Sequence, residues 1–155
     1  MGGKNHAKDN TVLWFDNNAE EAMNFYVSIF KDAAVGSVHK MDNKVLTASF
    51  TINGQEFMVL NGGPLFKFNE SVSFYVNCAD QNEVDYFWEK LTADGGQESQ
   101  CGWLKDKFGL SWQIVPQMLG TALWGPDKEG SQRAMQAMMQ MSKLDIDKLQ
   151  QAYNG

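Results

Sequence analysis

Side chains that commonly bind metals or act as nucleophiles are few and widely spaced in this sequence. The cysteines Cys78 and Cys101 lie 23 residues apart, without a Cys-x-x-Cys spacing and without a neighbouring histidine. This pattern disfavours a zinc site and a disulfide, and it leaves two unactivated thiols. His39 lies beside Lys40 on a candidate strand, where an exposed histidine is the simpler interpretation, and His6 stands in a loose N-terminus. No obvious motif for acid–base or metal chemistry is present.

Hydrogen-bonding side chains do recur on one face of four candidate strands, 11–16, 55–61, 73–78 and 110–116. Period-two alternation predicts that a wholly apolar face lies under the helices, with Val12, Trp14, Phe57, Val59, Phe74, Val76, Trp112 and Ile114. The opposite face is predicted to carry Thr11, Leu13, Phe15, Met58, Leu60, Ser73, Tyr75, Asn77, Gln113 and Val115. A mixed lining of this kind is typical of small-molecule pockets. The alternative is that these side chains fill a collapsed interface.

The elements that position these strands occur twice. A strand over 11–16 and an amphipathic helix over 18–30 are followed, 62 residues later, by a strand over 73–78 and a helix over 80–91. Asn17 or Asn18 is the expected cap of the first helix. Phe25 and Phe87 occupy equivalent positions in the two helices, and both are expected to be buried.

Three further strands are expected after each helix. They are predicted over 34–41, 45–53 and 55–61 in the first half and over 97–103, 104–107 and 110–116 in the second. Each half is therefore βαβββ, and the glycines and proline of 62–64 mark the boundary. The prediction is an α+β fold with modules 10–62 and 70–116, paired as one domain over 10–116, after a loose N-terminus of residues 1–9.

Residues 117–155 break the repeat and predict a C-terminal helical extension packed on the same domain. One helix is expected from Asp127 or Ser131 to about Leu144, and Asp145 is the expected cap of a final helix. This extension carries several large apolar side chains, and one small domain is not expected to bury all of them. They are Leu119, Leu123, Trp124, Met135, Met138 and Met139. Exposed apolar patches mark partner surfaces, which favours a homodimer.

Composition restricts the class of protein further. The 155 residues are 43% apolar and 21% charged, which is typical of one folded domain. The net charge is −6 without a basic stripe, so nucleic acid is not an expected partner. No segment approaches the roughly 20 consecutive apolar residues of a membrane span, and the first ten residues lack the apolar core of a signal peptide. We expect a cytoplasmic protein with no membrane partner.

Three segments together resemble a known family: LWFDNNAEEAMNFY at 13–26, NGQEFMVLNGGPLFKFNE at 53–70 and WLKDKFGLSWQIVP at 103–116. They are similar to the vicinal oxygen chelate superfamily, which includes glyoxalase I, bleomycin-resistance proteins and extradiol dioxygenases. Within it the resemblance is to the PhnB-like family, which often carries the label 3-demethylubiquinone-9 3-methyltransferase. The resemblance implies two βαβββ modules whose sheets face each other across a cleft, commonly completed by a second chain.

In that superfamily a divalent metal is held in the cleft by the first and last strands of each module. The resemblance places these positions on Thr11, Met58, Ser73 and Gln113, which include no histidine, aspartate or glutamate. A register shifted by one residue would place them on Val12, Phe57, Phe74 and Trp112, which are no better as ligands. Leu65 likewise stands where some relatives carry histidine. A metal-activated enzyme is therefore disfavoured, and no cofactor is expected.

The methyltransferase label finds no support in the sequence. A nucleotide-type methyl donor is normally held by a glycine-rich turn between a strand and a helix. The paired glycines at 2–3, 62–63 and 95–96 do not occupy such a turn.

Three functions remain open. The first is a protein that binds a small, partly aromatic or amphipathic molecule in a cleft walled by Phe15, Tyr75, Trp103 and their neighbours, without a metal. The second is a glyoxalase- or dioxygenase-type enzyme with an unrecognised metal or catalytic site, or one that uses Gln113, Tyr75 and a bound water. The third is an assembly module with a vestigial cleft. The candidate binding residues are Thr11, Leu13, Phe15, Met58, Leu60, Ser73, Tyr75, Trp103 and Gln113.

Overall fold

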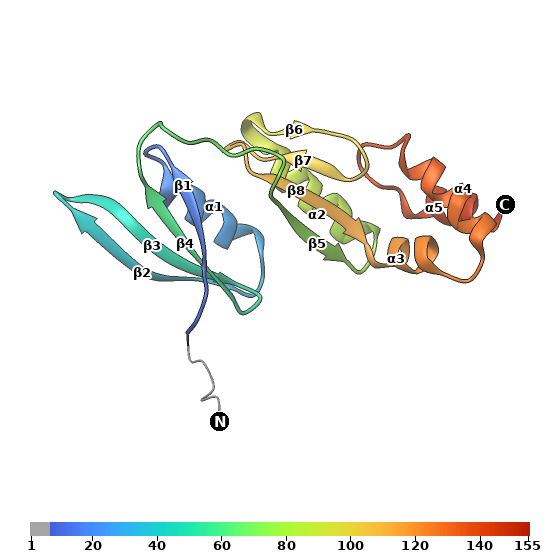
Figure 1. The fold of residues 1–155 in the computed structure, drawn as a ribbon, viewed down its shortest axis with the longest axis horizontal. Helices are drawn as coiled ribbons and strands as arrows, with labels where there is room; N and C mark the ends of the chain where they lie inside the picture. The colour runs from blue at the N-terminus through green and yellow to red at the C-terminus, as the bar shows by residue number, and fades with distance from the viewer. Residues whose placement is uncertain (1–6) are drawn as a thin grey trace, which may run out of the picture. The chain divides into compact units, whose positions relative to one another are not determined.

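The computed structural model describes residues 7–155, so His6 lies outside the described residues. The chain divides into two compact units between Lys67 and Phe68, shortly after the glycines and proline of 62–64 that mark the expected boundary. Each unit contains a four-stranded sheet and one long helix in the order βαβββ, and three more helices follow in the second unit (Figure 1). The predicted α+β class and the doubled module are confirmed.

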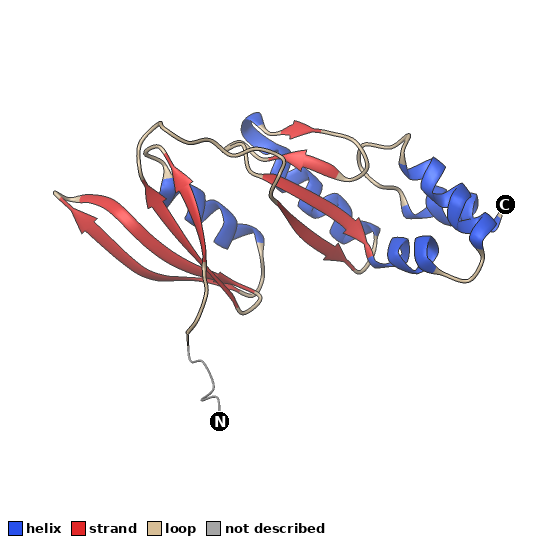
Figure 2. Cartoon of the chain, viewed as in Figure 1, coloured by secondary structure: helices blue, strands red, loops and turns tan. Residues whose placement is uncertain are grey.

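The first unit places its four strands in the order β1-β4-β3-β2 (Figure 2). Its elements are β1 (Thr11–Phe15), α1 (Ala19–Ile29), β2 (Ala33–Met41), β3 (Lys44–Ile52) and β4 (Gln55–Asn61). The pair β1–β4 is parallel and the other two pairs are antiparallel. Helix α1 packs on one face of this sheet, where the ring of Tyr26 lies 6.1 Å from that of Phe50, and Phe50 stacks on Phe57 at 5.2 Å.

The start of α1 is held by a residue from another strand. Asn18 occupies the N-cap position, but its side chain makes no capping hydrogen bond. Instead, the side-chain oxygen of Asn61, at the end of β4, accepts from the backbone N–H of Ala19 at 2.9 Å. The same amide group donates to the carbonyl of Val45 at 3.0 Å. The predicted cap by Asn17 or Asn18 is wrong because Asn61 supplies the acceptor across the sheet and also joins β4 to β3.

The second unit repeats the arrangement in the order β5-β8-β7-β6. Its elements are β5 (Ser73–Cys78), α2 (Gln81–Thr92), a 3-10 turn (Ala93–Gly95), β6 (Gln97–Glu98), β7 (Trp103–Lys105) and β8 (Ser111–Pro116). The strand predicted over 97–103 is reduced to two residues. Cys101 and Gly102 adopt positive φ angles of 60° and 84°, which interrupts the extended backbone before β7 begins.

The apolar stripes of α1 and α2 face their sheets as predicted, except for one phenylalanine in each helix. Phe25 and Phe87 are only half-buried, so their predicted burial is wrong. The next residue of each helix, Tyr26 or Trp88, also belongs to the predicted stripe and is buried, with 1% and 4% of its surface exposed. The predicted equivalence of the two helices holds, and Phe25 and Phe87 lie at the edge of the stripe that faces each sheet rather than at its centre. The indole of Trp88 donates to Glu98 at 2.6 Å, which joins α2 to β6.

The C-terminal extension forms three helices: α3 (Gln117–Trp124), α4 (Lys128–Met138) and α5 (Ile146–Asn154). Helix α3 was not predicted. Helix α4 ends about six residues earlier than expected, and the segment after it bonds to the loop before β7. The N–H groups of Cys101 and Gly102 donate to the carbonyls of Met141 and Ser142, both at 2.8 Å. Asp145 caps α5 as predicted, accepting from the backbone N–H of Lys148 at 3.1 Å.

The extension packs on the second unit through an apolar cluster and a polar clamp. Val115 of β8 is buried with Leu119, Leu144 and Leu149 of the extension. The side-chain amide of Gln81, in the first turn of α2, donates to the carbonyl of Leu144 at 3.0 Å and accepts from the N–H of Ile146 at 2.8 Å. Among residues 7–155, no helix is long and apolar enough to cross a membrane.

Candidate ligand-binding face

The sheet of the second unit has one face covered by α2 and one opposite face, called here the open face. The strand register places Gln113 of β8 beside Tyr75 of β5 on one side and beside Trp103 of β7 on the other. Register partners project from the same face, so these side chains form a row of three across the sheet, two aromatic residues with an amide between them, called here the aromatic row. Neighbouring strands are about 4.8 Å apart, which separates the two aromatic residues by about 10 Å with Gln113 between them.

A second row, two residues away along the strands, is polar. It consists of Ser73, Ser111 and Lys105, each a register partner of the next. The side-chain N–H of Gln113 donates to the Ser73 hydroxyl at 2.9 Å, which joins this polar row to the aromatic row. Lys105 forms an ion pair with Glu70, in the loop before β5. The open face therefore presents amide, hydroxyl and aromatic groups within two adjacent rows.

The groups of the two rows differ in exposure. Tyr75 has 59% of its surface exposed, and Ser73, Trp103, Lys105 and Gln113 are half-buried. Burial, and then the charge of nearby Cys78, raises the pKa of the Tyr75 hydroxyl above its ordinary value. This phenol consequently remains protonated at neutral pH and can donate a hydrogen bond. Ser111 is fully buried.

The position of the aromatic row depends on a buried carboxylate in the turn before β8. Asp106 accepts from the backbone N–H groups of Phe108 at 2.9 Å and Leu110 at 3.1 Å, and from the indole of Trp112 at 2.9 Å. Gly109 allows the turn to close with a φ of 88°, which a side chain would disfavour. The segment DKFGLSW thus fixes where β8 begins and on which face Gln113 lies.

The corresponding open face of the first sheet differs from the sequence prediction. Val12 is the register partner of Met58, and Trp14 is the partner of Leu60. Leu13 and Phe15 are 4% and 3% exposed on the opposite face, under α1. The predicted faces of β4, with Met58 and Leu60 away from the helix, are correct.

The predicted face of β1 is wrong by one residue, which moves Thr11, Leu13 and Phe15 to the helix side. The sequence TVLWF offers no polar residue inside the strand to mark the exposed face, so alternation cannot distinguish the two registers. Thr11, Leu13 and Phe15 therefore lie outside the candidate site. Val12 and Trp14 occupy the face away from the helix, where Thr11, Leu13 and Phe15 were predicted.

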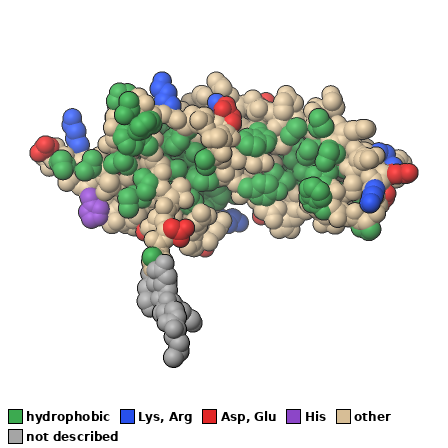
Figure 3. Space-filling model, in the orientation of Figure 1, with side chains coloured by type: hydrophobic (Ala, Val, Ile, Leu, Met, Phe, Trp, Pro, Cys, Tyr) green, Lys and Arg blue, Asp and Glu red, His purple; other side chains and the backbone are tan. Residues whose placement is uncertain are grey.

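Trp14 is held by the end of the first unit. Its indole N–H donates to the carbonyl of Gly63 at 2.9 Å, and its ring meets Phe66 edge to face at 5.0 Å. A Cβ atom at Gly62 would overlap the ring of Trp14, so this position requires glycine. Figure 3 shows hydrophobic side chains gathered over the strands of each unit.

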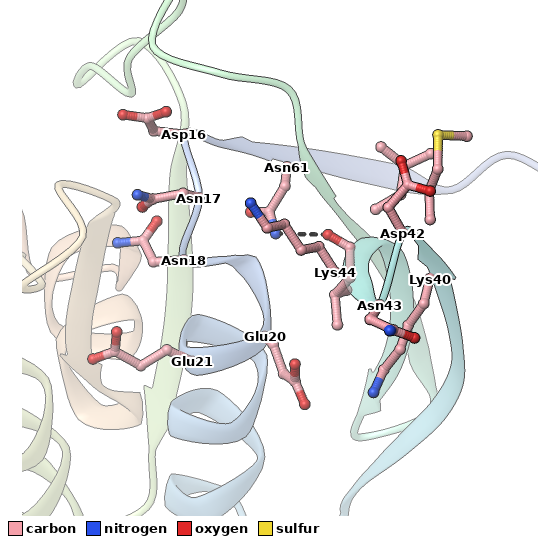
Figure 4. A pocket seen from close by; sticks show the side chains of 13 residues that line it. Asp16, Asn17, Asn18, Glu20, Glu21, Lys40, Asp42, Asn43, Lys44 and Asn61 are labelled. Carbon is pink, nitrogen blue, oxygen red and sulfur yellow. Dashed lines mark hydrogen bonds between the residues drawn. The ribbon is translucent and has the colours of Figure 1, made fainter.

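A wide groove of about 790 Å³ lies elsewhere in the first unit, between the start of α1 and the β2–β3 hairpin (Figure 4). It is lined by carboxylates, amides and two lysines, among them Asp16, Glu20, Asp42 and Lys44, and it contains none of the predicted site residues. One of its amides, Asn61, already bonds to the backbone through both its oxygen and its nitrogen. In the part of the chain that the structure describes, no three His, Cys, Asp or Glu side chains gather as a metal site.

Comparisons with solved structures define the class of protein. The PhnB protein of Bacillus cereus is 36% identical, with a TM-score of 0.66, over 71% of this chain and 99% of that chain. Protein PA1353 of Pseudomonas aeruginosa is 17% identical, with a TM-score of 0.59, over 71% and 97%. The fosfomycin resistance protein FosX of Listeria monocytogenes, solved with Mn(II) and sulfate, is 16% identical, with a TM-score of 0.50, over 69% and 86%. The fold is that of the vicinal oxygen chelate superfamily.

Within this class, the family model for 3-demethylubiquinone-9 3-methyltransferase matches residues 7–115. The chain belongs to this PhnB-like family. No curated protein matches the chain. The family model ends where β8 ends, so the helices α3 to α5 lie beyond it.

The family positions for a divalent metal can be tested against the side chains present. With the observed register, the first unit offers Val12 and Met58, and the second offers Ser73 and Gln113. A hydrocarbon, a thioether, a hydroxyl and a neutral amide do not form the carboxylate or imidazole set that Mn(II) and similar ions require. The donor set does not fit such a metal.

Proposed function

We propose that the protein binds a small, partly aromatic or amphipathic molecule on the open face of the second sheet, without a metal. The observation that carries this proposal is the row formed by Tyr75, Gln113 and Trp103, in which an amide group stands between two aromatic side chains. Aromatic rings supply apolar contact, and a few fixed polar groups orient the ligand. Tyr75 is too exposed to serve the hydrophobic core of its own unit, which supports a role in binding.

Methyl transfer, which the family description names, is not part of this proposal. The pair Gly62-Gly63 follows β4, and the pair Gly95-Gly96 lies between α2 and β6. Neither pair connects a strand to a following helix, which is where a glycine-rich turn binds a nucleotide-type methyl donor.

A second candidate function is catalysis on the same face. The protonated phenol of Tyr75 can act as a general acid toward a ligand held beside Gln113. The discriminating measurement is chemical: a bound compound recovered unchanged after prolonged incubation supports a binding protein, whereas conversion supports an enzyme. Stoichiometric zinc, nickel, manganese or iron in the purified protein would instead favour a metal-dependent enzyme.

The binding proposal is tested by a thermal-shift screen of small aromatic and amphipathic compounds. A ligand at 100 times its Kd adds about 2.7 kcal/mol to the stability of the native state. The variant Tyr75→Ala should bind each hit about five- to thirtyfold more weakly, because a buried ring contact contributes on the order of 1–2 kcal/mol. Tyr86→Ala is the matched control, since Tyr86 is an exposed tyrosine on α2. Equal affinity of the two variants for every hit would refute this site.

A further inference from the structure

The polar row of the open face contains a buried hydroxyl without a partner. Within the described part of the chain, the Ser111 side-chain oxygen is buried and makes no hydrogen bond. A buried hydroxyl left in this condition costs about 1–3 kcal/mol, so native proteins usually satisfy it. The register places Ser111 between Ser73 and Lys105 and two residues before Gln113. The unmet hydroxyl therefore belongs to the candidate binding face.

The neighbouring polar groups also retain unused hydrogen-bonding capacity. The Ser73 hydroxyl accepts from the Gln113 amide, and the described residues provide no acceptor for its own proton. The carbonyl oxygen of Gln113 is likewise not bonded within residues 7–155. Ser111, Ser73 and Gln113 thus offer both donors and acceptors in one small area. A hydroxyl, carbonyl or amide group of a ligand could use them.

The one cation in this polar row is already neutralised. Lys105 pairs with Glu70, and the hydrogen bond from Lys105 keeps the pKa of the Glu70 carboxyl below its ordinary value. Glu70 therefore remains ionised and paired at neutral pH. The two rows as a whole carry no net charge available to a ligand, since their other members are serine, glutamine, tyrosine and tryptophan.

We infer that the ligand of this face is an uncharged aromatic molecule whose hydroxyl, carbonyl or amide group hydrogen-bonds to Ser111 and Ser73, while its ring lies between Tyr75 and Trp103. This inference rests on the proposed function and specifies its ligand class. Because Ser111 is fully buried, a ligand reaches its hydroxyl only if a neighbouring side chain moves, and its half-buried register partner Lys105 is one such neighbour. Carboxylate analogues are rejected because Glu70 occupies the only positive charge of the row.

The first test uses 4-propylphenol as the probe and the variant Ser111→Ala. Loss of one hydrogen bond should weaken probe binding by about five- to tenfold in calorimetric titration. The free variant should melt no lower than the wild type, because the substitution removes an unsatisfied buried hydroxyl. Ser28→Ala, at an exposed serine of α1, should change neither affinity nor melting temperature. A lower melting temperature with unchanged affinity would show that Ser111 binds only an internal water, and the inference would be wrong.

The second test compares 4-propylphenol with 4-propylbenzoate. The wild type should bind the carboxylate at least about tenfold more weakly, which corresponds to one unit of log Kd. Glu70→Gln should raise the affinity for the carboxylate several-fold and leave that for the phenol unchanged, because it frees Lys105. Equal binding of both probes by the wild type would contradict the inference.

These outcomes separate the inference from the proposal beneath it. Probe binding that depends on Tyr75 but not on Ser111 would retain the binding function and overturn only the ligand class. If neither the phenol nor any compound of the aromatic screen binds, the proposed function fails, and the ligand class fails with it.

Discussion

At the scale of single residues, the buried carboxylate of Asp106 and the buried thiol of Cys78 differ in whether hydrogen bonds compensate for their burial. Asp106 receives three N–H donors, so its buried oxygens are satisfied and organise the turn before β8. Cys78 has no such set of donors. Burial, followed by the negative charges of Glu83 and Asp80, raises the pKa of its thiol to about 12. Asp106 therefore supports structure through its polar atoms, whereas Cys78 contributes as a small apolar side chain.

Replacing Asp106 by alanine should destabilise the protein by about 2–4 kcal/mol, because it leaves two backbone N–H groups and a buried indole N–H without an acceptor. Urea unfolding measures this change. Glu89→Ala, on the exposed side of α2, is the control and should stay within about 0.5 kcal/mol of the wild type. A loss as small as that of the control would show that the turn before β8 does not depend on this carboxylate.

Cys78 should make stability depend on alkaline pH. A thiol whose folded-state pKa is raised to about 12 from 9.0 favours the folded protein fully below pH 9, and this contribution is lost as pH rises toward 12. Urea unfolding at pH 8 and pH 10 should therefore show a smaller loss of stability in Cys78→Ala than in the wild type. Identical losses would contradict the assigned burial.

In the native state, iodoacetamide should modify the half-exposed Cys101 much faster than Cys78.

At the scale of elements, alternation and turn signals predicted the two modules. The face of a strand was predicted correctly only where a polar side chain inside the strand marked it. In β5 and β8, Ser73, Tyr75 and Gln113 mark the open face, and the structure places them there. Strand β1 carries no such marker, so its face was predicted wrongly. Ser111 and Lys105 were missed as members of the candidate face. Counting back two residues from Gln113 would have found Ser111, but Lys105 requires the pairing of β7 with β8, which sequence spacing alone does not define.

The cap of α1 gives a direct test of this lesson. Asn61→Ala should cost about 1–2 kcal/mol, because it removes the acceptor for Ala19 N–H and the bond to Val45. Asn18→Ala should cost much less, although Asn18 occupies the N-cap position, since its side chain makes no capping bond. Thermal unfolding of the two single variants provides the comparison. The opposite ranking would restore the cap predicted from the sequence and contradict the observed hydrogen bonds.

At the scale of the whole molecule, the extension beyond the family model is part of the second unit. Its apolar cluster with Val115 and the clamp from Gln81 secure residues 141–149 against β8 and α2. Leu119 is buried by this packing, and Leu123 and Met138 are partly covered. Several of the side chains that suggested a partner surface thus pack inside the second unit. Trp124, Met135 and Met139 remain exposed at 83%, 41% and 58%.

Because these three apolar side chains remain exposed, we still predict a homodimer. Large apolar side chains left on a surface favour association, and identical chains related by a two-fold axis are the commonest partners. Light scattering at micromolar concentration should give the mass of two chains, about 35 kDa from 17.4 kDa each. If α3 and α4 form the interface, Trp124→Ser should shift the mass toward one chain, because Trp124 is the most exposed apolar residue of the extension.

Tyr86→Ser, which removes an exposed aromatic residue from α2 instead, is the control for that shift and should leave a dimer. A dimer that persists in both variants would place the interface on another surface, such as the open faces of the sheets, where Val12 and Tyr75 are also exposed. A mass of one chain that does not change on concentration would refute the dimer. The extension would then act only within its own chain, by covering Val115 and bracing the end of β8 that carries Gln113.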